Sequence, residues 1–284
     1  MSEHTRTGGA ASVREQPPAT ANDDGDDRST GESGAGELAG KDLVVGYPGS
    51  ETPVIDGETI EVEPGSVTAL VGPNGSGKST LLKTLADQLD ADAGSVLVDG
   101  NDTNSLAPRE MATKLGLLSQ ESASPSSLTV EDLVYHGRYP HRGFFEQVTE
   151  ADQAAVNRAM ELAGVRHLRT RAIGSLSGGQ KQLAWIAMVL AQEPEVLLLD
   201  EPTTYLDLHH QLRVMETIER LNEEDGVTVG VVLHDIAQAA RRADYLVALE
   251  DGSVYDWGPP AEVLTEELLS DVFSVDAVIS YTPD

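Results

Sequence analysis

The sequence predicts an α/β protein with a mostly parallel core sheet, a helical insert and a smaller antiparallel β portion. An apolar run at 67–71 leads through a glycine-rich loop into leucines at helical spacing, which is a strand–loop–helix unit. Two further apolar runs, 196–200 and 227–233, each end in polar side chains. The segment from about 104 to 192 is mostly helical in pattern, and 245–257 has the pattern of a hairpin.

The chain is strongly acidic. Its 284 residues include 48 Asp and Glu against 19 Lys and Arg, which gives a formal net charge of −29. A broad basic surface is therefore excluded, and we expect no nucleic-acid partner. Charge of this size is tolerated where salt shortens the Debye length to about 3 Å. The composition favours a halophilic protein from a high-salt cytoplasm, with an ordinary acidic protein as the alternative.

The N-terminal residues differ in composition from the rest. Residues 1–40 consist largely of Gly, Ser, Thr, Ala and acidic residues, with almost no large apolar side chains. Such a segment cannot offset the entropy of folding, so we expect a disordered acidic tail. Ordered structure is expected to begin near Leu43, within a domain spanning 41–284.

No segment has the pattern of a membrane anchor. The chain lacks a run of roughly 20 consecutive apolar residues and the apolar segment of a signal peptide. It also contains no cysteine, which suits a reducing compartment. We therefore expect a cytoplasmic protein.

The glycine-rich loop has the composition of a phosphate-binding site. Its three glycines let backbone N–H groups surround an anion, and the helix that follows adds the positive end of its dipole. Lys78 is expected to reach the phosphates, and the Ser79 hydroxyl to ligate Mg²⁺. A glycine-rich turn without a ligand is the alternative, which the strand and helix on either side argue against. The expected cofactor-binding residues are Gly72, Pro73, Asn74, Gly75, Ser76, Gly77, Lys78, Ser79 and Thr80.

Polar side chains follow three other apolar runs. In a parallel sheet these carboxyl ends face the ligand. Gln120 is expected to meet Mg²⁺ or the attacking water, and His234 shares the same edge, although a lone histidine there is usually structural. Asp200 and Glu201 point opposite ways along one strand, so Asp200 can hold Mg²⁺ while Glu201 polarises a water; two solvated acids are the alternative. His209 and His210 are expected to be surface residues.

A second anion site is predicted at the start of another helix. Two glycines and a serine precede the helical run 183–191, within Leu176–Gln180. With one obvious nucleotide, either this second site is idle or it serves a partner's nucleotide. Asp207 is placed to cap the next helix, and Tyr47 can lie beside a nucleotide base or be an ordinary strand-end tyrosine.

With these motifs in this order, the chain from about Leu43 onward resembles the ATP-binding subunit of an ABC transporter, a P-loop NTPase. The resemblance implies that two copies pair head to tail around MgATP. The segment Ser177–Gly179 of one copy, part of the family's signature motif, would then meet the γ-phosphate held by Lys78 of the other copy. The resemblance also implies that Glu201 is the general base, and that the region after Gln120 receives a membrane permease. The remaining roles that it implies are signature contacts for Ser177, Gly178, Gly179 and Gln180, adenine stacking for Tyr47, a γ-phosphate contact for His234 and the dimer seam for Asp207.

Three stretches resemble the importers of iron-siderophores, haem and cobalamin. They are Gly137–His141, Ala184–Met188 and Pro202–Asp207. The resemblance implies two permease subunits, an extracytoplasmic solute-binding protein and a place on the cytoplasmic face of the membrane. The chain departs from the family at Lys181 and Leu183, where arginines are common, and in its long acidic tail. An ABC ATPase of iron-sulfur cluster assembly, with soluble partners, is the alternative.

Overall fold

The computed structural model describes residues 36–280, apart from residue 51 and residues 121–125 and 144–145. Most of the predicted 1–40 tail lies outside the described residues. The first strand, β1 (Leu38–Val45), begins before the Leu43 expected from the sequence. It does so because buried Leu38 pairs with Val62 on one side and with Val98 on the other.

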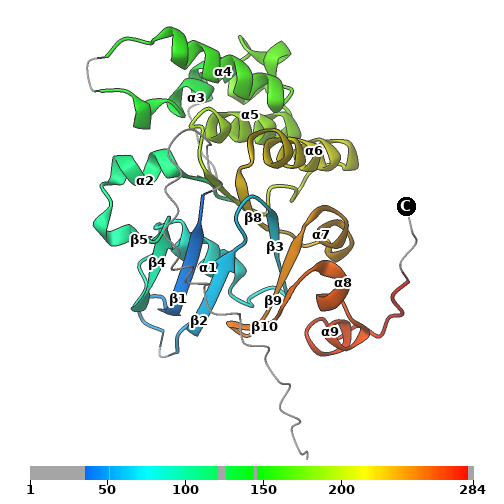
Figure 1. Cartoon of the computed structure of the whole chain (residues 1–284). Helices are drawn as coiled ribbons and strands as arrows, with labels where there is room; N and C mark the ends of the chain where they lie inside the picture. The colour runs from blue at the N-terminus through cyan, green and yellow to red at the C-terminus, as the bar shows by residue number, and fades with distance from the viewer. Residues whose placement is uncertain (1–35, 51, 121–125, 144–145, 281–284) are drawn as a thin grey trace, which may run out of the picture. The chain divides into compact units, whose positions relative to one another are not determined.

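Two sheets form the β structure of the described residues (Figure 1). The core sheet has the order β10-β9-β3-β8-β7-β6, and its strands are parallel except for β10. The second sheet, of order β2-β1-β4-β5, is antiparallel. The further strands are β2 (Ile55–Val62), β3 (Val67–Val71), β4 (Ala93–Val98), β5 (Asn101–Asp102), β6 (Leu115–Leu118), β7 (Val196–Asp200), β8 (Thr228–Val232), β9 (Tyr245–Glu250) and β10 (Ser253–Gly258).

The helices lie between these strands and after the last of them, and α3, α4 and α5 follow one another without a strand between them. They are α1 (Lys78–Leu85), α2 (Pro108–Lys114), α3 (Val130–His136), α4 (Glu150–Leu162), α5 (Gly178–Leu190), α6 (Leu208–Asp225), α7 (Ile236–Arg242), α8 (Pro260–Val263) and α9 (Glu266–Asp271). No helix in the described part of the chain is long and apolar enough to cross a membrane. The fold is therefore the predicted mixed α/β fold, with an antiparallel portion beside a mostly parallel sheet.

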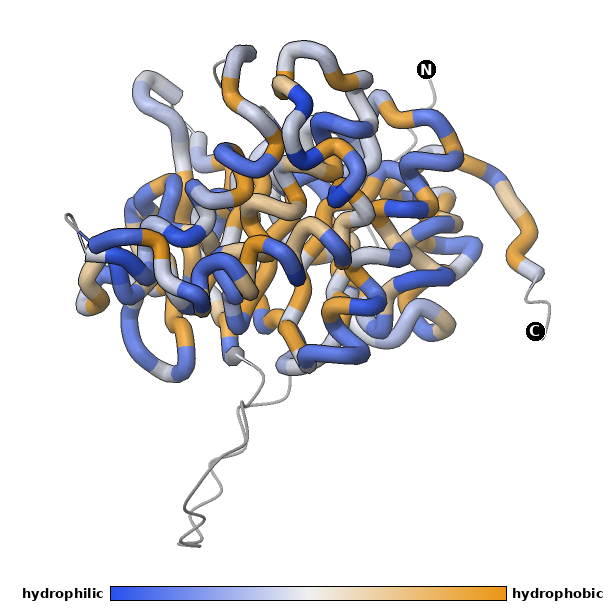
Figure 2. The backbone as a smooth tube through the Cα atoms, turned by 90° about the horizontal axis from the view of Figure 1, so that it is seen from above, coloured by the Kyte–Doolittle hydropathy of each residue, from blue (hydrophilic) through white to orange (hydrophobic). Residues whose placement is uncertain are grey.

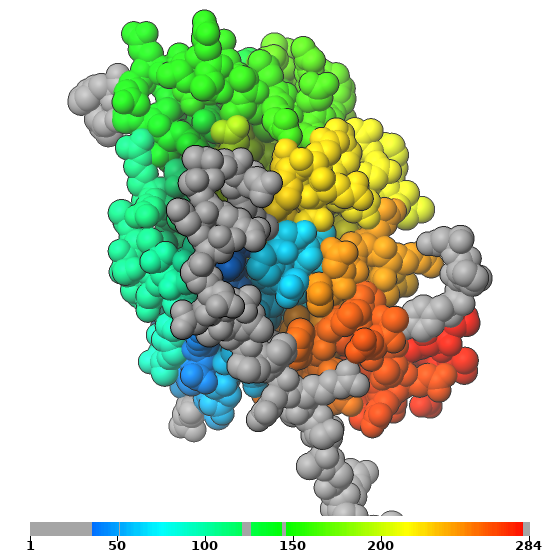
Figure 3. Space-filling model, viewed as in Figure 1, coloured from blue at the N-terminus to red at the C-terminus, as the bar shows by residue number. Residues whose placement is uncertain are grey.

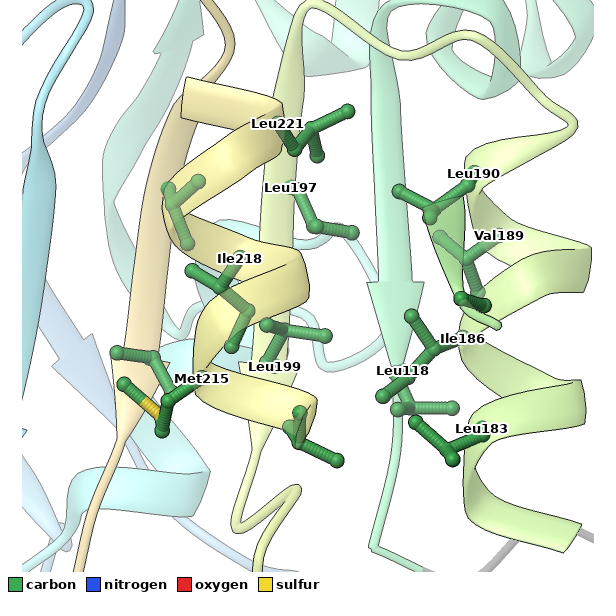
Figure 4. Packing of buried hydrophobic residues seen from close by; sticks show 14 of the residues in the cluster. Leu118, Leu183, Ile186, Val189, Leu190, Leu197, Leu199, Met215, Ile218 and Leu221 are labelled. Atoms are coloured by element: carbon green, nitrogen blue, oxygen red, sulfur yellow. The ribbon is translucent and has the colours of Figure 1, made fainter. Parts of the chain in front are cut away.

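The core sheet is buried on both faces. Along β7, Leu197 and Leu199 pack into one apolar cluster with α5 and α6, whereas Val196 and Leu198 pack into the other with α1 and the antiparallel sheet. Figure 4 shows the first cluster from close by, where Leu199 lies near Met215 and Ile218 of α6. In the tube coloured by hydropathy, orange segments gather in the interior and blue segments lie around them (Figure 2). A sheet covered on both faces explains why β7 and β8 are continuously apolar.

The helical region is built on α3, α4 and α5, which pack against one another. Capping boxes open α3 at Thr129 and α4 at Thr149. The structure also places β6, a strand of the core sheet, inside the range 104–192, so helical structure beyond this strand begins at α3.

The α1 helix is shorter than the leucine pattern suggests. Leu81, Leu82 and Leu85 are fully buried, as the pattern predicts. The helix ends at Leu85, however, because Asp87 adopts a left-handed conformation with φ of +57°. Leu89 therefore lies beyond the helix and packs from there against the second apolar cluster.

The Gly137–His141 stretch follows α3 and packs against α5. A Cβ placed on Gly137 would lie 2.0 Å from the carbonyl oxygen of Met188, so only glycine permits this approach. Arg138 is 5% exposed, and its Nε donates to Asp152 Oδ1 over 3.0 Å, while Nη1 donates to Glu193 Oε2 over 2.6 Å. This stretch is therefore a packing and ion-pair junction of the helical region.

Candidate nucleotide site

Four neighbouring strands of the core sheet deliver the candidate residues to one edge. The order β3-β8-β7-β6 is parallel, so the carboxyl ends of these strands lie side by side. Gly72 and Glu201 follow β3 and β7 directly, and His234 and Gln120 follow β8 and β6 after one intervening residue. The predicted convergence of these residues at the sheet edge is confirmed.

The glycine loop uses backbone conformations that favour glycine. Gly72, Gly75 and Gly77 have φ of +152°, +86° and +98°. A Cβ on Gly72 would lie 2.2 Å from the carbonyl oxygen of Leu249, and one on Gly77 would lie 2.7 Å from Ile55 Cδ1. Side chains at these two positions would therefore force the loop open.

Lys78 lies folded back under this loop. Its Nζ donates to the carbonyl oxygens of Gly72 and Pro73 over 2.9 and 2.8 Å, and to Ser76 Oγ over 3.4 Å. Burial lowers the pKa of Lys78, while the carboxylates of Glu201 and Asp200 oppose this effect. The loop therefore holds a cation at its centre, ready to meet an anion that the surrounding N–H groups bind.

Ser79 and Asp200 form the candidate metal-binding pair. Ser79 Oγ donates to Asp200 Oδ1 over 2.7 Å. Asp200 is 1% exposed, and its Oδ2 is buried without a hydrogen-bond partner. Burial raises the pKa of this carboxyl, which the hydrogen bond from Ser79 opposes. A buried, unpartnered carboxylate oxygen beside a hydroxyl is a donor set that fits Mg²⁺, since Mg²⁺ takes a few oxygen ligands from protein and keeps several waters.

Glu201 is held by three side chains. His234 Nε2 lies 2.7 Å from Oε1, while Gln120 Nε2 and Thr204 Oγ1 donate to Oε2 over 2.8 and 3.2 Å. Glu201 has a positive φ of +52°, and its side chain is 11% exposed. Gln120 therefore lies beside the carboxylate of Glu201, at the same strand edge as Asp200.

Thr204 was not predicted from the sequence. The contact is local in the sequence, because Thr204 lies three positions after Glu201, in the turn that begins with the positive φ of Glu201. The backbone N–H of Thr204 also donates to the Glu201 carbonyl oxygen over 3.2 Å. A hydroxyl at this position of a turn is the pattern that could have identified it.

Asp207 and Ser177 each cap a helix. Asp207 Oδ1 accepts from the backbone N–H of His210 at the start of α6, and Ser177 Oγ accepts from the N–H of Gln180 in a capping box. The expectation that His210 is a surface residue is wrong, because its side chain is only 22% exposed and its Nδ1 lies 2.9 Å from Asp207 Oδ1. Packing against another helix, which the sequence does not display, covers this ring.

Tyr47 lies beside the start of α1. Its hydroxyl is 3.2 Å from Thr80 Oγ1, and the residue is 47% exposed. It lines a hollow of about 510 Å³ that Pro48, Pro53 and Leu89 also line. An aromatic ring near the phosphate loop is thus available at the surface.

The two predicted anion sites are separate within one chain. In the described residues no hydrogen bond or ion pair joins the Ser177–Gln180 segment to the loop 72–80. The side-chain hydrogen bonds of Ser177 and Gln180 are to each other. The two segments that the sequence predicts to bind phosphate are therefore without polar contact to each other in the described part of one chain.

Known proteins share this sequence and fold. Residues 55–204 match the family described as ABC transporter. The chain is 44% identical over 246 residues to the ferric enterobactin transport ATP-binding protein FepC of Escherichia coli (strain K12), covering 87% of this chain and 90% of that protein. It is 41% identical to the iron(3+)-hydroxamate import ATP-binding protein FhuC of Bacillus subtilis (strain 168), covering 87% and 91%.

A solved structure gives the same result. The dimeric structure of MJ0796, a bacterial ABC transporter cassette, matches with a TM-score of 0.70 and 28% identity, covering 78% of this chain and 98% of that one. The family match covers more than half of the chain, and the two relatives match it nearly end to end. The chain therefore belongs to the ABC transporter family, as one of its ATPase domains.

Proposed function

We propose that this chain is the ATP-hydrolysing subunit of an importer that drives uptake of a metal chelate, with an iron-siderophore as cargo. The observation that carries the proposal is the end-to-end similarity to ATP-binding proteins named for ferric enterobactin transport and iron(3+)-hydroxamate import. The Gln120–Glu201–His234 cluster, at the same sheet edge as the glycine loop, supports the hydrolysis of ATP.

The glycine loop and Lys78 would bind the phosphates of ATP. The loop conformation presents backbone N–H groups, and Lys78 Nζ would exchange the carbonyl oxygens of Gly72 and Pro73 for phosphate oxygens. Tyr47 would stack on the adenine ring from the adjacent hollow. Ser79 and Asp200 would hold Mg²⁺, which when bound would stabilise the charge that develops on the phosphates.

Glu201 would be the general base. Its carboxylate would accept a proton from the attacking water, which Gln120 would orient from the neighbouring strand end. His234 holds the other carboxylate oxygen, so the acceptor geometry is fixed before nucleotide arrives. His234 would also contact the γ-phosphate of the bound nucleotide.

A second copy of the chain would complete the site. Ser177, Gly178, Gly179 and Gln180 form a helix N-terminus that no nucleotide loop of the same chain uses, and a helix N-terminus suits phosphate. Head-to-tail pairing would bring it to the γ-phosphate of the partner, with Asp207 at the seam. The dimeric cassette structure to which the chain is similar supports this assembly.

In the cell the dimer would lie on the cytoplasmic face of the membrane, bound to two permease subunits that an extracytoplasmic solute-binding protein serves. Closure on ATP and reopening after hydrolysis would drive the permease. A role in iron-sulfur cluster assembly is not favoured, because both relatives bear names of transport proteins. Cobalamin and haem remain the competing cargoes.

Reconstitution tests the proposal. The chain would be placed in proteoliposomes with the permease and the solute-binding protein that co-purify with it, and ATP-dependent uptake of radiolabelled ferric siderophore, cobalamin and haem would be compared. We expect uptake of the siderophore, and none with a Glu201→Gln variant. ATP-independent uptake, or preference for cobalamin or haem, would contradict the proposed role or cargo respectively.

A further inference from the structure

The N-termini of α5 and α6 meet through the ring of His210. A Cβ placed on Gly179 would lie 2.4 Å from both Cγ and Cδ2 of that ring, closer than side-chain contacts permit. The imidazole therefore lies directly against the backbone of Gly179, the second residue of α5. Only glycine leaves room for the ring at this point.

The same ring fixes Asp207. Asp207 Oδ1 accepts from the backbone N–H of His210 over 3.0 Å and lies 2.9 Å from Nδ1 of its ring. These two hydrogen bonds lower the pKa of the Asp207 carboxyl, so at neutral pH it is a carboxylate and can only accept. Nδ1 therefore carries the hydrogen. The Asp207 side chain is 68% exposed, so its rotamer is held by the ring of His210 and by the N-cap bond from the backbone N–H of the same residue, which a side-chain substitution leaves in place.

The His210 ring sits at a junction of three segments. It lines a hollow of about 260 Å³ together with Gln180 of α5, Arg213 of α6 and His167 from the turn after α4. Figure 3 shows the yellow surface of α6 directly beneath the green surface of the helical region. Movement of α5 relative to α6 would therefore change the contacts of this ring.

We propose that His210 is a positioning residue for ATP hydrolysis, which holds Asp207 and the Ser177–Gly179 segment in one fixed arrangement. The inference rests on the proposed function, in which both segments act on the nucleotide of a second copy. The ring contacts Gly179 and Asp207 at once, so it fixes the distance between the two segments before they meet the second copy. In the described chain no hydrogen bond joins His210 to the loop 72–80, so its loss should weaken dimer closure and leave nucleotide binding to the isolated chain intact.

Three substitutions separate the two contacts of the ring. His210→Ala removes both the packing on Gly179 and the hydrogen bond to Asp207. His210→Asn keeps a donor in the place of Nδ1, whereas His210→Phe keeps a ring against Gly179 without a donor. His209→Ala is the matched control: this exposed ring meets the His210 ring edge-on, with centroids 5.4 Å apart, but neither lies against Gly179 nor makes a hydrogen bond to Asp207 in the described chain.

The test measures the dissociation constant of the ATP-bound dimer by analytical ultracentrifugation, with every variant carrying Glu201→Gln as well. We expect His210→Ala to weaken dimerisation about tenfold, the order of one charge-assisted hydrogen bond, and His210→Asn to restore most of the loss. Fluorescent-ATP affinity of the monomer should stay within about twofold of the parent for all variants. Hydrolysis by His210→Ala without the Glu201 change should recover as the protein concentration rises, a response that a merely destabilised fold would not give.

Several outcomes would overturn the inference. They are unchanged dimerisation of His210→Ala, equal losses for His209→Ala, and a loss of monomer ATP affinity as large as the loss of dimerisation. Should His210→Ala fail to fold by circular dichroism, His210→Phe takes its place, and its wild-type dimerisation would count against the Asp207 clamp. A parent protein that neither hydrolyses ATP nor pairs on it refutes the proposed function itself, before any His210 variant is compared.

Discussion

Ser79, on the first turn of α1, donates a 2.7 Å hydrogen bond to Oδ1 of Asp200 at the end of β7, 121 positions away in the chain. The other carboxylate oxygen is buried and unpartnered. A buried carboxylate without full compensation destabilises the fold in the absence of a ligand. The same group therefore connects metal binding to stability.

Replacing Asp200 by Asn should stabilise the nucleotide-free protein while impairing its use of Mg²⁺. Because burial raises the pKa of Asp200 in the folded state, its charged form lowers the free energy of unfolding as pH rises above the ordinary carboxyl value. We expect a melting temperature about 3 °C higher at pH 7, with no difference below pH 3.8, where the carboxyl is protonated in both states. The Mg²⁺ concentration for half-maximal ATPase should rise at least about tenfold.

Melting curves across pH and Mg²⁺ titrations of phosphate release measure both effects. Asp276→Asn serves as the control, since that carboxylate is exposed near the C-terminus. An Asp200→Asn protein that melts lower at pH 7, or that keeps its Mg²⁺ response, would contradict the assignment.

The Glu201→Gln variant should bind ATP but hardly hydrolyse it. General-base catalysis contributes about 10²- to 10⁴-fold, and glutamine cannot accept the proton. We expect kcat to fall by this factor while a dimer accumulates with ATP, as measured by phosphate release and size-exclusion chromatography. Lys78→Ala provides the contrast, because it should lose ATP binding as well. Retention of most of the activity by Glu201→Gln would remove Glu201 from this role.

Arg138→Met should destabilise the helical region. Burial by itself raises the pKa of Asp152, but hydrogen bonds from Thr149 and Arg138 outweigh it and lower the pKa to about 2. Removing the guanidinium leaves a buried carboxylate, at a cost of about 3 kcal/mol. The stabilisation by ionised Asp152 is present above pH 3.8 and is lost as pH falls toward about 2. The penalty for Arg138→Met should shrink over the same range.

Urea unfolding between pH 2 and pH 7 measures this penalty. A double variant, Arg138→Met with Asp152→Asn, should recover part of the loss, because no charge is then left buried. Arg166→Met is the matched control: its pair with Glu161 spans 3.8 Å between exposed side chains, so a change within about 0.5 kcal/mol is expected. Equal losses for the two arginine variants would show that burial of the pair is irrelevant.

Salt should stabilise the protein. A net charge of −29 repels itself when the Debye length is long, and at 1 M salt this length falls to about 3 Å. We expect the melting temperature to rise steadily between 0.05 and 3 M KCl, as followed by circular dichroism. Sucrose at matched osmolality should not reproduce the rise. A fold equally stable at millimolar salt would argue against halophilic adaptation.

The parts of the site that the sequence predicted are those with local causes. The glycine loop depends on φ values and close approaches within a few residues, and Gln120, Glu201 and His234 each follow an apolar strand of a parallel sheet. Strand order alone then brings them together. Thr204 was missed because it lies in a turn that depends on the left-handed conformation of Glu201, which the sequence does not predict.

The contacts that the sequence did not predict are tertiary. His210 has the sequence context of an exposed helix residue, and it is covered only because α5 presents a glycine to it. The early start of β1 depends likewise on pairing with β2 and β4. Helix packing and strand pairing between distant segments decide these features, and neither leaves a periodic signal in a single chain.

The position of β6 sets what can move near Gln120. Among the described strands β6 is at the edge of the core sheet and pairs with β7, whereas β7, β8 and β3 are each paired on both sides. A shift of Gln120 would therefore strain the β6–β7 ladder and leave the pairing between β7, β8 and β3 in place. The strand ends that carry Gly72 and Glu201 would keep their spacing while the edge strand adjusts.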